Sequence, residues 1–187
     1  MSSENEKLIL VDESDNEIGL LSKAECHDGS GVLHRAFSVF IFNADGDLLL
    51  QQRGKGKRLW PSFWSNSCCS HPREGESMEV ATGRRLQEEL GIQIDLEYVY
   101  KFRYQAGFGE RGSEHELCSV YLGRCNGEAR PNVTEIDAIR YVSAETLSDE
   151  IAAQADSFTP WFRQEWDQLN KQHSEMLSRY SSKEAAA

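Results

Sequence analysis

The segment from Gly75 to Gly91 constrains the fold of this 187-residue chain more than any other part of it. Serine is a common residue at the start of a helix and glycine is common just after its end, so Ser77 and Gly91 predict a helix over Ser77–Leu90. Positions four apart share one face of a helix, which pairs each of the two adjacent arginines with a glutamate: Arg84 with Glu88, and Arg85 with Glu89.

A thiol and an imidazole lie just upstream of this helix. Residues 64–72 read Trp-Ser-Asn-Ser-Cys-Cys-Ser-His-Pro, so Cys69 stands two residues before His71. A thiol can act as a general acid or base, and a charged helix beside it can serve a phosphate group. The combination indicates an enzyme that acts on a diphosphate ester by moving a proton.

Length and composition indicate an ordinary globular protein. Hydrophobic residues make up 39% of the chain and aromatic residues 10%, which fits a single domain over 1–187 with a core of about 30–180. A net charge of −11 argues against nucleic acid or an anionic membrane as a partner. Five cysteines without a repeated spacing fit reduced thiols. We therefore expect a cytoplasmic monomer with no membrane span.

The remaining patterns predict an α+β chain with a mixed sheet flanked by helices. The expected hairpins and strands are Lys7–Val11 with Ile18–Leu21, Ala36–Phe42 with Leu48–Gln52 across a turn at 43–47, Ile92–Tyr104 with Leu117–Leu122 around a loop at Ala106–Ser113, and Ile139–Val142. The expected helices at the C-terminal end are Ser143–Ala155 and Thr159–Tyr180, followed by a disordered tail at Ser181–Ala187.

The helix from Ser77 to Leu90 closely resembles the Nudix signature, G-x5-E-x7-R-E-U-x-E-E-x-G-U. In that family the helix presents carboxylates to a divalent metal ion bound to a diphosphate. Two positions depart from the signature, because Ser70 replaces the leading glycine and Arg85 replaces a glutamate. The resemblance therefore implies the fold but an incomplete hydrolase site. Taken alone, the helix could also be a solvated surface helix with ion pairs.

The cysteine segment resembles the type I isopentenyl-diphosphate isomerases, which carry a modified Nudix fold, through Trp-x-Asn-Ser-x-Cys-x-His-Pro. Five further matches follow the family order between about Leu8 and Trp161: His27 and His34 before Arg35-Ala36-Phe37-Ser38, Arg53 and Lys57 before Trp60-Pro61, Phe102-Arg103-Tyr104, Glu114-x-Glu116, and Pro160-Trp161. The resemblance implies a Nudix-like α/β/α sandwich with an N-terminal hairpin and a C-terminal helical extension. It also implies isomerisation of isopentenyl diphosphate to dimethylallyl diphosphate in isoprenoid biosynthesis.

Three imidazoles and two carboxylates form a candidate metal site, namely His27, His34, His71, Glu114 and Glu116. Glutamates two apart in a strand leave the same face, so both can reach one ion. A mixed nitrogen and oxygen shell of this size suits Mn²⁺ or Mg²⁺, and Zn²⁺ is an alternative. Each histidine alone could equally be a core or surface residue. His115 should face away from the set, and His173 lies on a late helix.

Moving a double bond requires one proton to be added and another removed, and the resemblance assigns this acid/base work to Cys69 and Glu116. The motif does not constrain Cys68. The positively charged intermediate must be kept from water and faced by aromatic rings. Trp161 and Tyr104 match the family at such positions, and Tyr104 could also hydrogen-bond to Glu116. Cys69 as a small buried side chain, and both aromatic residues as core packing, are the structural alternatives.

The diphosphate requires cations. The isomerase family that the chain resembles places basic residues around the phosphates, and the matching positions here are Lys23, Arg53, Lys57 and Arg85. Ser70 could donate a hydrogen bond to the same diphosphate. Glu89 would hold a second ion, Mg²⁺, that bridges to the phosphate oxygens. Lys55 and Arg58 are expected to be solvated loop charges.

Two other functions are compatible with parts of the pattern. A Nudix diphosphate hydrolase is the first, and Arg85 and Cys69 argue against it. A metal-stabilised binding protein without activity is the second, and the presence of both Cys69 and Glu116 argues against that. No glycine-rich dinucleotide fingerprint is present, so we expect no flavin.

Overall fold

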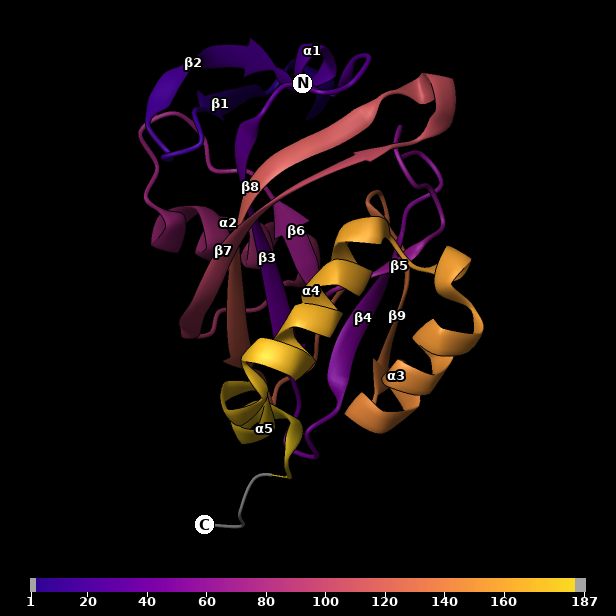
Figure 1. Cartoon of the computed structure of the whole chain (residues 1–187). Helices are drawn as coiled ribbons and strands as arrows, with labels where there is room; N and C mark the ends of the chain where they lie inside the picture. Colours follow the sequence, from indigo (N-terminus) through magenta and orange to yellow (C-terminus); the bar gives the residue numbers. More distant parts are fainter. Residues whose placement is uncertain (1–2, 184–187) are drawn as a thin grey trace.

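The computed structural model describes residues 3–183 and contains a mixed β-sheet with helices on both faces (Figure 1). A 3₁₀ turn, η1 (Ser3–Asn5), precedes the N-terminal hairpin of β1 (Lys7–Val11) and β2 (Glu17–Ser22), which confirms the predicted hairpin. The helix α1 (Lys23–His27) was not predicted. Its first turn is closed by a reciprocal cap, in which Ser22 accepts from the Glu25 amide while the Glu25 carboxylate accepts from the Ser22 amide.

The centre of the sheet is β3 (His34–Phe42), which pairs in parallel with β8 (Ser113–Arg124) and antiparallel with the short β6 (Cys68–Ser70). The next strand, β4 (Leu48–Arg53), pairs with β5 (Trp64–Ser65) and β9 (Ile136–Val142). We expected β3 and β4 to pair along their length, but a single pair, Phe42 with Leu48, joins them. The two strands diverge, and the segment carrying β5 and β6 lies between them.

Side chains of that inserted segment hold the diverging strands. The Ser67 hydroxyl accepts from the Ile41 amide of β3 at 2.8 Å and donates to the Leu49 carbonyl of β4 at 2.6 Å. The Asn66 amide donates to the carbonyls of Val39 and Cys68. The Asn-Ser part of the cysteine motif therefore replaces the missing ladder between β3 and β4, and so fixes where β6 begins.

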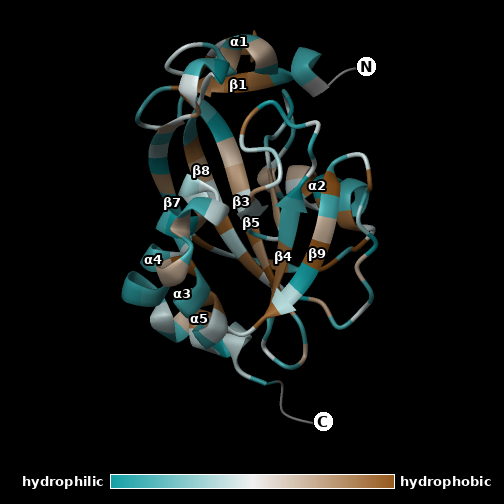
Figure 2. Cartoon of the chain, turned by 90° about the vertical axis from the view of Figure 1, so that its right-hand side faces the viewer, coloured by the Kyte–Doolittle hydropathy of each residue, from teal (hydrophilic) through white to brown (hydrophobic). Residues whose placement is uncertain are grey.

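Helices cover the sheet from two sides (Figure 2). One face packs on α2 (Met78–Leu90), whose buried Ala81, Leu86 and Leu90 contact alternate residues of β3. The other face packs on α3 (Ala144–Ala153) and α4 (Pro160–Gln172), together with α5 (Ser174–Ser181). The strand alternation of β3 thus separates two apolar clusters, which is the three-layer sandwich that the sequence predicts.

The helix predicted from the signature is confirmed, with Ser77 as its cap and Gly91 in the left-handed conformation at φ 67°. Several other boundaries were wrong, including the starts of β8 and β9, which begin earlier than expected. The helix expected over Thr159–Tyr180 is divided at His173, and the connection before α4 includes the 3₁₀ turn η3 (Ala155–Ser157). The strand β7 begins later, at Leu96, and runs to Gly107. It forms a long hairpin with β8 whose tip is the 3₁₀ turn η2 (Gly109–Arg111), so the expected loop is shorter.

The expected C-terminal tail lies mainly outside the described residues, because Ser181 ends α5 and the description stops at Lys183. Within residues 3–183, no helix is long and apolar enough to span a bilayer.

Candidate active site

Three imidazoles converge from three separate elements. His27 ends α1, His34 opens β3, and His71 follows β6. The Nε2 atoms of His34 and His71 lie 3.2 Å apart, and the ring centroids of the three residues are 4.9 to 6.0 Å apart. The His34 Nδ1 donates to the Val32 carbonyl at 2.7 Å, which leaves Nε2 facing the cluster. All three side chains are buried.

Two carboxylates from β8 complete the cluster. Glu114 Oε2 lies 3.0 Å from His27 Nε2 and 4.0 Å from His34 Nε2. Glu116 Oε1 lies 3.0 Å from His71 Nε2 and 3.7 Å from His34 Nε2. The intervening His115 faces the other side of the strand and contacts Arg103, as expected from strand alternation.

The chemistry of this cluster fits a divalent ion. Ligand atoms of His27, His34, His71 and Glu114 all lie within 4.8 Å of one another. Separations of roughly 3 to 4 Å are those between ligands of one ion with bonds of roughly 2.1 Å. His27 Nε2 and Glu114 Oε2 are buried and, although 3.0 Å apart, form no well-aligned hydrogen bond with each other or with another described residue. Burial also lowers the pKa of His71 to about 4, so this imidazole keeps a lone pair for an ion at neutral pH.

The adjacent cysteines face opposite sides of the sheet. Cys68 is fully buried in the apolar cluster beneath α2, with Phe37, Val39 and Leu86. Cys69 is half-buried and lines a small cavity of about 40 Å³ on the other face, which it shares with Glu116 and Trp161. Burial raises the pKa of Cys69 to about 12, against the opposing effect of Arg53, so the side chain is a protonated thiol at neutral pH.

Glu116 enters this cavity as a carboxylate. Burial by itself raises the pKa of Glu116, but its interactions with the imidazoles of His34 and His71 outweigh it and hold the pKa well below its ordinary value. The Tyr104 hydroxyl donates to Glu116 Oε2 at 2.6 Å, and burial raises the pKa of Tyr104 well above its ordinary value. Tyr104 is therefore a neutral donor that fixes one oxygen of Glu116.

An aromatic wall closes the cavity. Trp161, in the first turn of α4, is 2% exposed and packs edge-on against Trp60 at 5.2 Å between ring centroids. Its ring lies 6.1 Å from that of Tyr104 and 5.1 Å from the Arg53 guanidinium carbon. The face of Trp161 thus already accommodates a cation, which is the electrostatic property that a positively charged intermediate requires.

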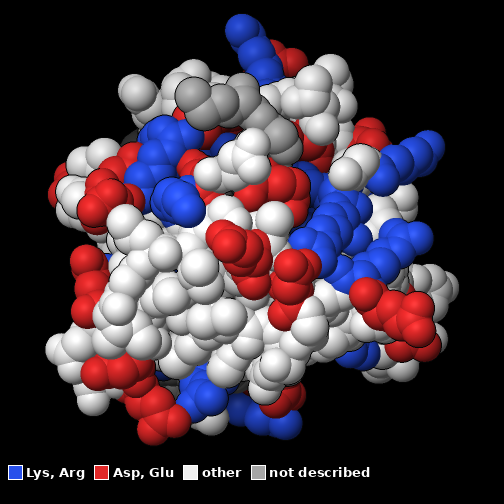
Figure 3. Space-filling view, turned by 90° about the horizontal axis from the view of Figure 1, so that it is seen from above, with Lys and Arg blue, Asp and Glu red and all other residues white. Residues whose placement is uncertain are grey.

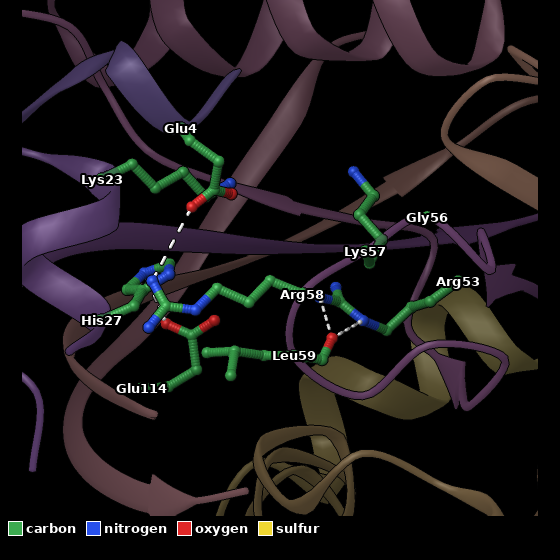
Figure 4. A pocket seen from close by; sticks show the side chains of 9 residues that line it. All are labelled: Glu4, Lys23, His27, Arg53, Gly56, Lys57, Arg58, Leu59 and Glu114. Carbon is green, nitrogen blue, oxygen red and sulfur yellow. Dashed lines mark hydrogen bonds and ion pairs between the residues drawn. The ribbon is translucent and has the colours of Figure 1, made fainter. Parts of the chain in front are cut away.

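Basic side chains surround a larger outer cavity of about 250 Å³ that adjoins the first (Figure 4). Lys23, Arg53 and Lys57 line both cavities. Arg53 is oriented by the carbonyls of Leu59 and Trp60. Burial lowers the pKa of Lys23, and the nearby charge of Lys57 lowers it further. Seen from above, groups of basic side chains lie next to groups of acidic ones on this face (Figure 3).

The residues from α2 approach the same region from the opposite layer. Arg85 lines the inner cavity and pairs with Glu88 and Glu89, while Arg84 pairs with Glu88 as the helical spacing predicts. Glu89 is buried behind Arg85, with the Gln51 amide at 3.5 Å, and does not line the cavity itself.

Sequence reasoning missed Glu135. Its carboxylate bridges Lys57 Nζ at 2.6 Å and Arg85 NH2 at 2.9 Å, so it joins the basic loop to α2. Burial by itself raises the pKa of Glu135, but Lys57 and Arg85 outweigh it and lower the pKa to about 2. Nothing local marks this position, because Glu135 is one acidic residue in the loop before β9.

Eleven residues line the inner cavity, and all of them were singled out from the sequence for catalysis, substrate or metal: Lys23, Arg53, Lys57, Cys69, Ser70, His71, Arg85, Tyr104, Glu114, Glu116 and Trp161. The structure brings these residues together from both layers of the sandwich. Their assigned roles remain predictions, which are taken up below.

The chain matches the NUDIX domain family model over residues 32–162. It is 40% identical over 174 residues to isopentenyl-diphosphate Delta-isomerase 1 of Photorhabdus laumondii, covering 92% of this chain and 99% of that protein. It is 44% identical over 158 residues to the isopentenyl-diphosphate Delta-isomerase of Serratia proteamaculans, covering 84% and 88%.

The fold is shared with solved structures at lower sequence identity. The crystal structure of DR0079 from Deinococcus radiodurans superposes with a TM-score of 0.65 at 24% identity, covering 79% of this chain and 90% of that one. This likeness concerns the fold alone, whereas the two sequence relatives extend over most of both chains. The chain belongs to the NUDIX family and, within it, to the type I isopentenyl-diphosphate Δ-isomerases.

Proposed function

We propose that this chain converts isopentenyl diphosphate to dimethylallyl diphosphate by adding one proton and removing another. The observation that carries the proposal is the pair formed by Cys69 and Glu116 in one cavity. Its first member is a protonated thiol and its second a carboxylate. The pair therefore supplies one proton donor and one proton acceptor, which an isomerisation without net gain of protons requires.

The walls of the inner cavity suit a carbocation. Adding a proton to the double bond creates a tertiary cation, and removing a proton from the neighbouring carbon restores the double bond at its new position. Trp161 and Tyr104 offer aromatic faces without a nucleophilic atom. The small volume around Cys69 leaves little room for water, which would otherwise capture the cation.

The histidine cluster would hold a divalent ion through His27, His34, His71, Glu114 and Glu116, with Mn²⁺ or Mg²⁺ preferred and Zn²⁺ an alternative. When bound, such an ion supplies positive charge beside Glu116, which lowers the proton affinity of that carboxylate. The protein itself orients Glu116 through the Tyr104 hydroxyl, which donates to Oε2.

The diphosphate would lie in the outer cavity among Lys23, Arg53 and Lys57, with Arg85 and Ser70 at the junction of the two cavities. A second ion, Mg²⁺, at Glu89 would require this carboxylate to leave its ion pair with Arg85, because Glu89 lines neither cavity. Arg85 stands where the Nudix signature has a glutamate, so a cation faces the diphosphate in place of a metal-binding carboxylate. This substitution favours a diphosphate that is retained over one that is hydrolysed.

The compartment and assembly belong to the same proposal. Cys26, Cys68, Cys69, Cys118 and Cys125 are all free thiols, which fits the reducing cytoplasm. Every residue proposed for the site comes from one chain, so a monomer is sufficient for the reaction.

The test is an NMR assay of the purified protein with isopentenyl diphosphate in D₂O, with and without Mg²⁺. We expect deuterated dimethylallyl diphosphate to appear in a metal-dependent manner. Released phosphate would instead identify a diphosphate hydrolase. An unchanged substrate in the presence of bound metal would contradict both enzymatic functions and favour a binding protein.

A further inference from the structure

The helix that carries His27 is short and lies outside the main sheet ladder. α1 spans only five residues, yet it bears both His27 and Lys23. Isolated helices of this length are unstable in water, so tertiary contacts must hold α1 in place. His34 lies on a strand paired on both sides, and His71 directly follows β6, which pairs with β3. His27 instead ends a short helix outside these ladders.

The side chain of Arg58 provides such contacts. Its NH1 donates to the Ala24 carbonyl of α1 at 3.2 Å, and its NH2 donates to the Asp28 carboxylate directly after His27. Its Nε donates to the Arg111 carbonyl at the tip of the β7–β8 hairpin, at 2.9 Å. Arg58 therefore joins the basic loop, the ends of α1 and the hairpin tip, and it lies beside His27 and Glu114 (Figure 4).

The hairpin tip supports His27 from a second direction. Gly112 has φ 127°, and a Cβ at this position would overlap the carbonyl oxygen of His27 and approach the Arg58 guanidinium. The backbone of the tip thus packs directly on the last residue of α1. Arg58 and Gly112 together confine His27 between the basic loop and the hairpin.

We propose that Arg58 is a positioning residue that holds His27 in the geometry required by the metal site. The inference rests on the metal site proposed above. The three side-chain nitrogen atoms of Arg58 each donate to a protein oxygen, two of them at α1 and its C-cap and one at the hairpin tip, an arrangement that uses the planar fork of a guanidinium. A lysine ammonium carries the same charge but cannot reach the three acceptors in this geometry.

The competing role for Arg58 is binding of the diphosphate, because the residue also lines the outer cavity. The two roles differ in what a lysine can restore. A phosphate contact needs mainly positive charge, so Arg58→Lys would retain most of it. Positioning of His27 needs the fork, so Arg58→Lys would behave like Arg58→Ala.

The experiment measures binding of Mn²⁺ to metal-free protein by calorimetry and electron paramagnetic resonance, without diphosphate, alongside kcat and KM at saturating metal. We expect Arg58→Ala and Arg58→Lys each to weaken Mn²⁺ binding by roughly ten-fold, the effect typical of residues that orient a metal ligand. The kcat at saturating Mn²⁺ should stay within about two-fold of the wild type, since excess metal restores the site.

Two further variants complete the design. Lys55→Ala removes an exposed cation from the same loop and should leave Mn²⁺ affinity unchanged. Gly112→Ala should weaken Mn²⁺ binding, because the added Cβ displaces His27 from the hairpin side.

Several results would overturn the inference. Unchanged Mn²⁺ affinity in Arg58→Ala with a higher KM for isopentenyl diphosphate would assign Arg58 to the phosphates. Full recovery of Mn²⁺ binding in Arg58→Lys would show that charge alone matters. A wild-type protein that binds no Mn²⁺ at all would instead refute the metal site, so the two failures are distinguishable.

Discussion

At the scale of single residues, Cys68 and Cys69 show how one step along a strand changes the role of a side chain. We expect Cys69→Ala to lower kcat by roughly 100- to 10,000-fold, the usual contribution of an acid/base group. Cys68→Ala should leave kcat unchanged but lower the free energy of unfolding by about 1 kcal/mol, because it removes a buried sulfur from the cluster beneath α2.

Steady-state kinetics and urea denaturation of both cysteine variants separate these effects. If Cys68→Ala were the inactive variant, the assignment of the catalytic cysteine would be wrong by one position. The effect expected at Cys68 is on stability because its side chain is fully buried, and buried side chains contribute to packing.

Tyr104 affords a second prediction at this scale. Tyr104→Phe removes the 2.6 Å hydrogen bond to Glu116 while keeping the aromatic ring. A hydrogen bond to a charged group contributes about 1.5–3 kcal/mol, so kcat should fall by roughly 10- to 100-fold. Mn²⁺ binding should weaken less than kcat falls, because Tyr104 contacts Oε2 of Glu116, whereas Oε1 is the oxygen beside His34 and His71. An equal loss in kcat and metal affinity would place Tyr104 in support of the metal site instead.

At the scale of elements, α1 should depend on the metal more than any strand does. Chelation should speed amide hydrogen exchange in residues 23–33, because the ion would tie His27 to ligands on β3 and β8. Amides of β3 and β8 should be little affected, since the parallel ladder between them does not involve the ion. Hydrogen-exchange mass spectrometry with and without chelator measures both, and uniform protection in the two states would contradict the prediction.

The elements also show what could be predicted from the sequence. The capped helix α2, the N-terminal hairpin and the shared face of Glu114 and Glu116 follow from local rules of spacing and capping. The divergence of β3 and β4 does not, because strand pairing depends on residues distant in the chain. The break between α4 and α5 at His173 could not be predicted either, because no proline or glycine marks it in the sequence. In the folded chain the His173 ring stacks on that of Tyr100, with 4.7 Å between the ring centroids.

The same distinction holds for the candidate site. Cys69 and His71 stand in a dense motif, so the family resemblance singled them out, and both line the inner cavity. Arg58 was expected to be solvated, but its acceptors lie at positions 24, 28 and 111, which only the folded chain brings together. Glu135 was missed for the same reason, since its partners Lys57 and Arg85 are far from it in sequence.

At the scale of the whole molecule, one buried acid should shape the dependence of stability on pH. Glu165 of α4 is fully buried, with the Cys118 thiol at 3.7 Å from Oε1 and no hydrogen-bond partner for Oε2. Burial raises the pKa of Glu165 from 4.5 to about 8. Between these values the unfolded chain loses a proton that the folded chain keeps, so stability falls as pH rises through that range.

At pH 7 the raised pKa of Glu165 lowers the free energy of unfolding by roughly 3 kcal/mol, because pH 7 lies 2.5 units above 4.5 and each unit corresponds to about 1.36 kcal/mol. Glu165→Gln removes the titration, so the difference in unfolding free energy between pH 5 and pH 7.5 should shrink by a similar amount. Urea denaturation at the two pH values measures it, with the exposed Glu175→Gln as the matched control. An unchanged pH difference in Glu165→Gln would show that Glu165 is ionised in the folded protein.

The alternation along β3 has a consequence for how the protein tolerates change. His34 belongs to the metal cluster and Ala36 to the cluster beneath α4, whereas Phe37 and Val39 pack against α2. One mutational screen can score cell growth and a second the abundance of the protein. The two scores should therefore differ at every second residue of this strand. Substitutions of residues that face α2 would reduce the amount of folded protein. Substitutions at the start of the other face would reduce the activity of each folded molecule.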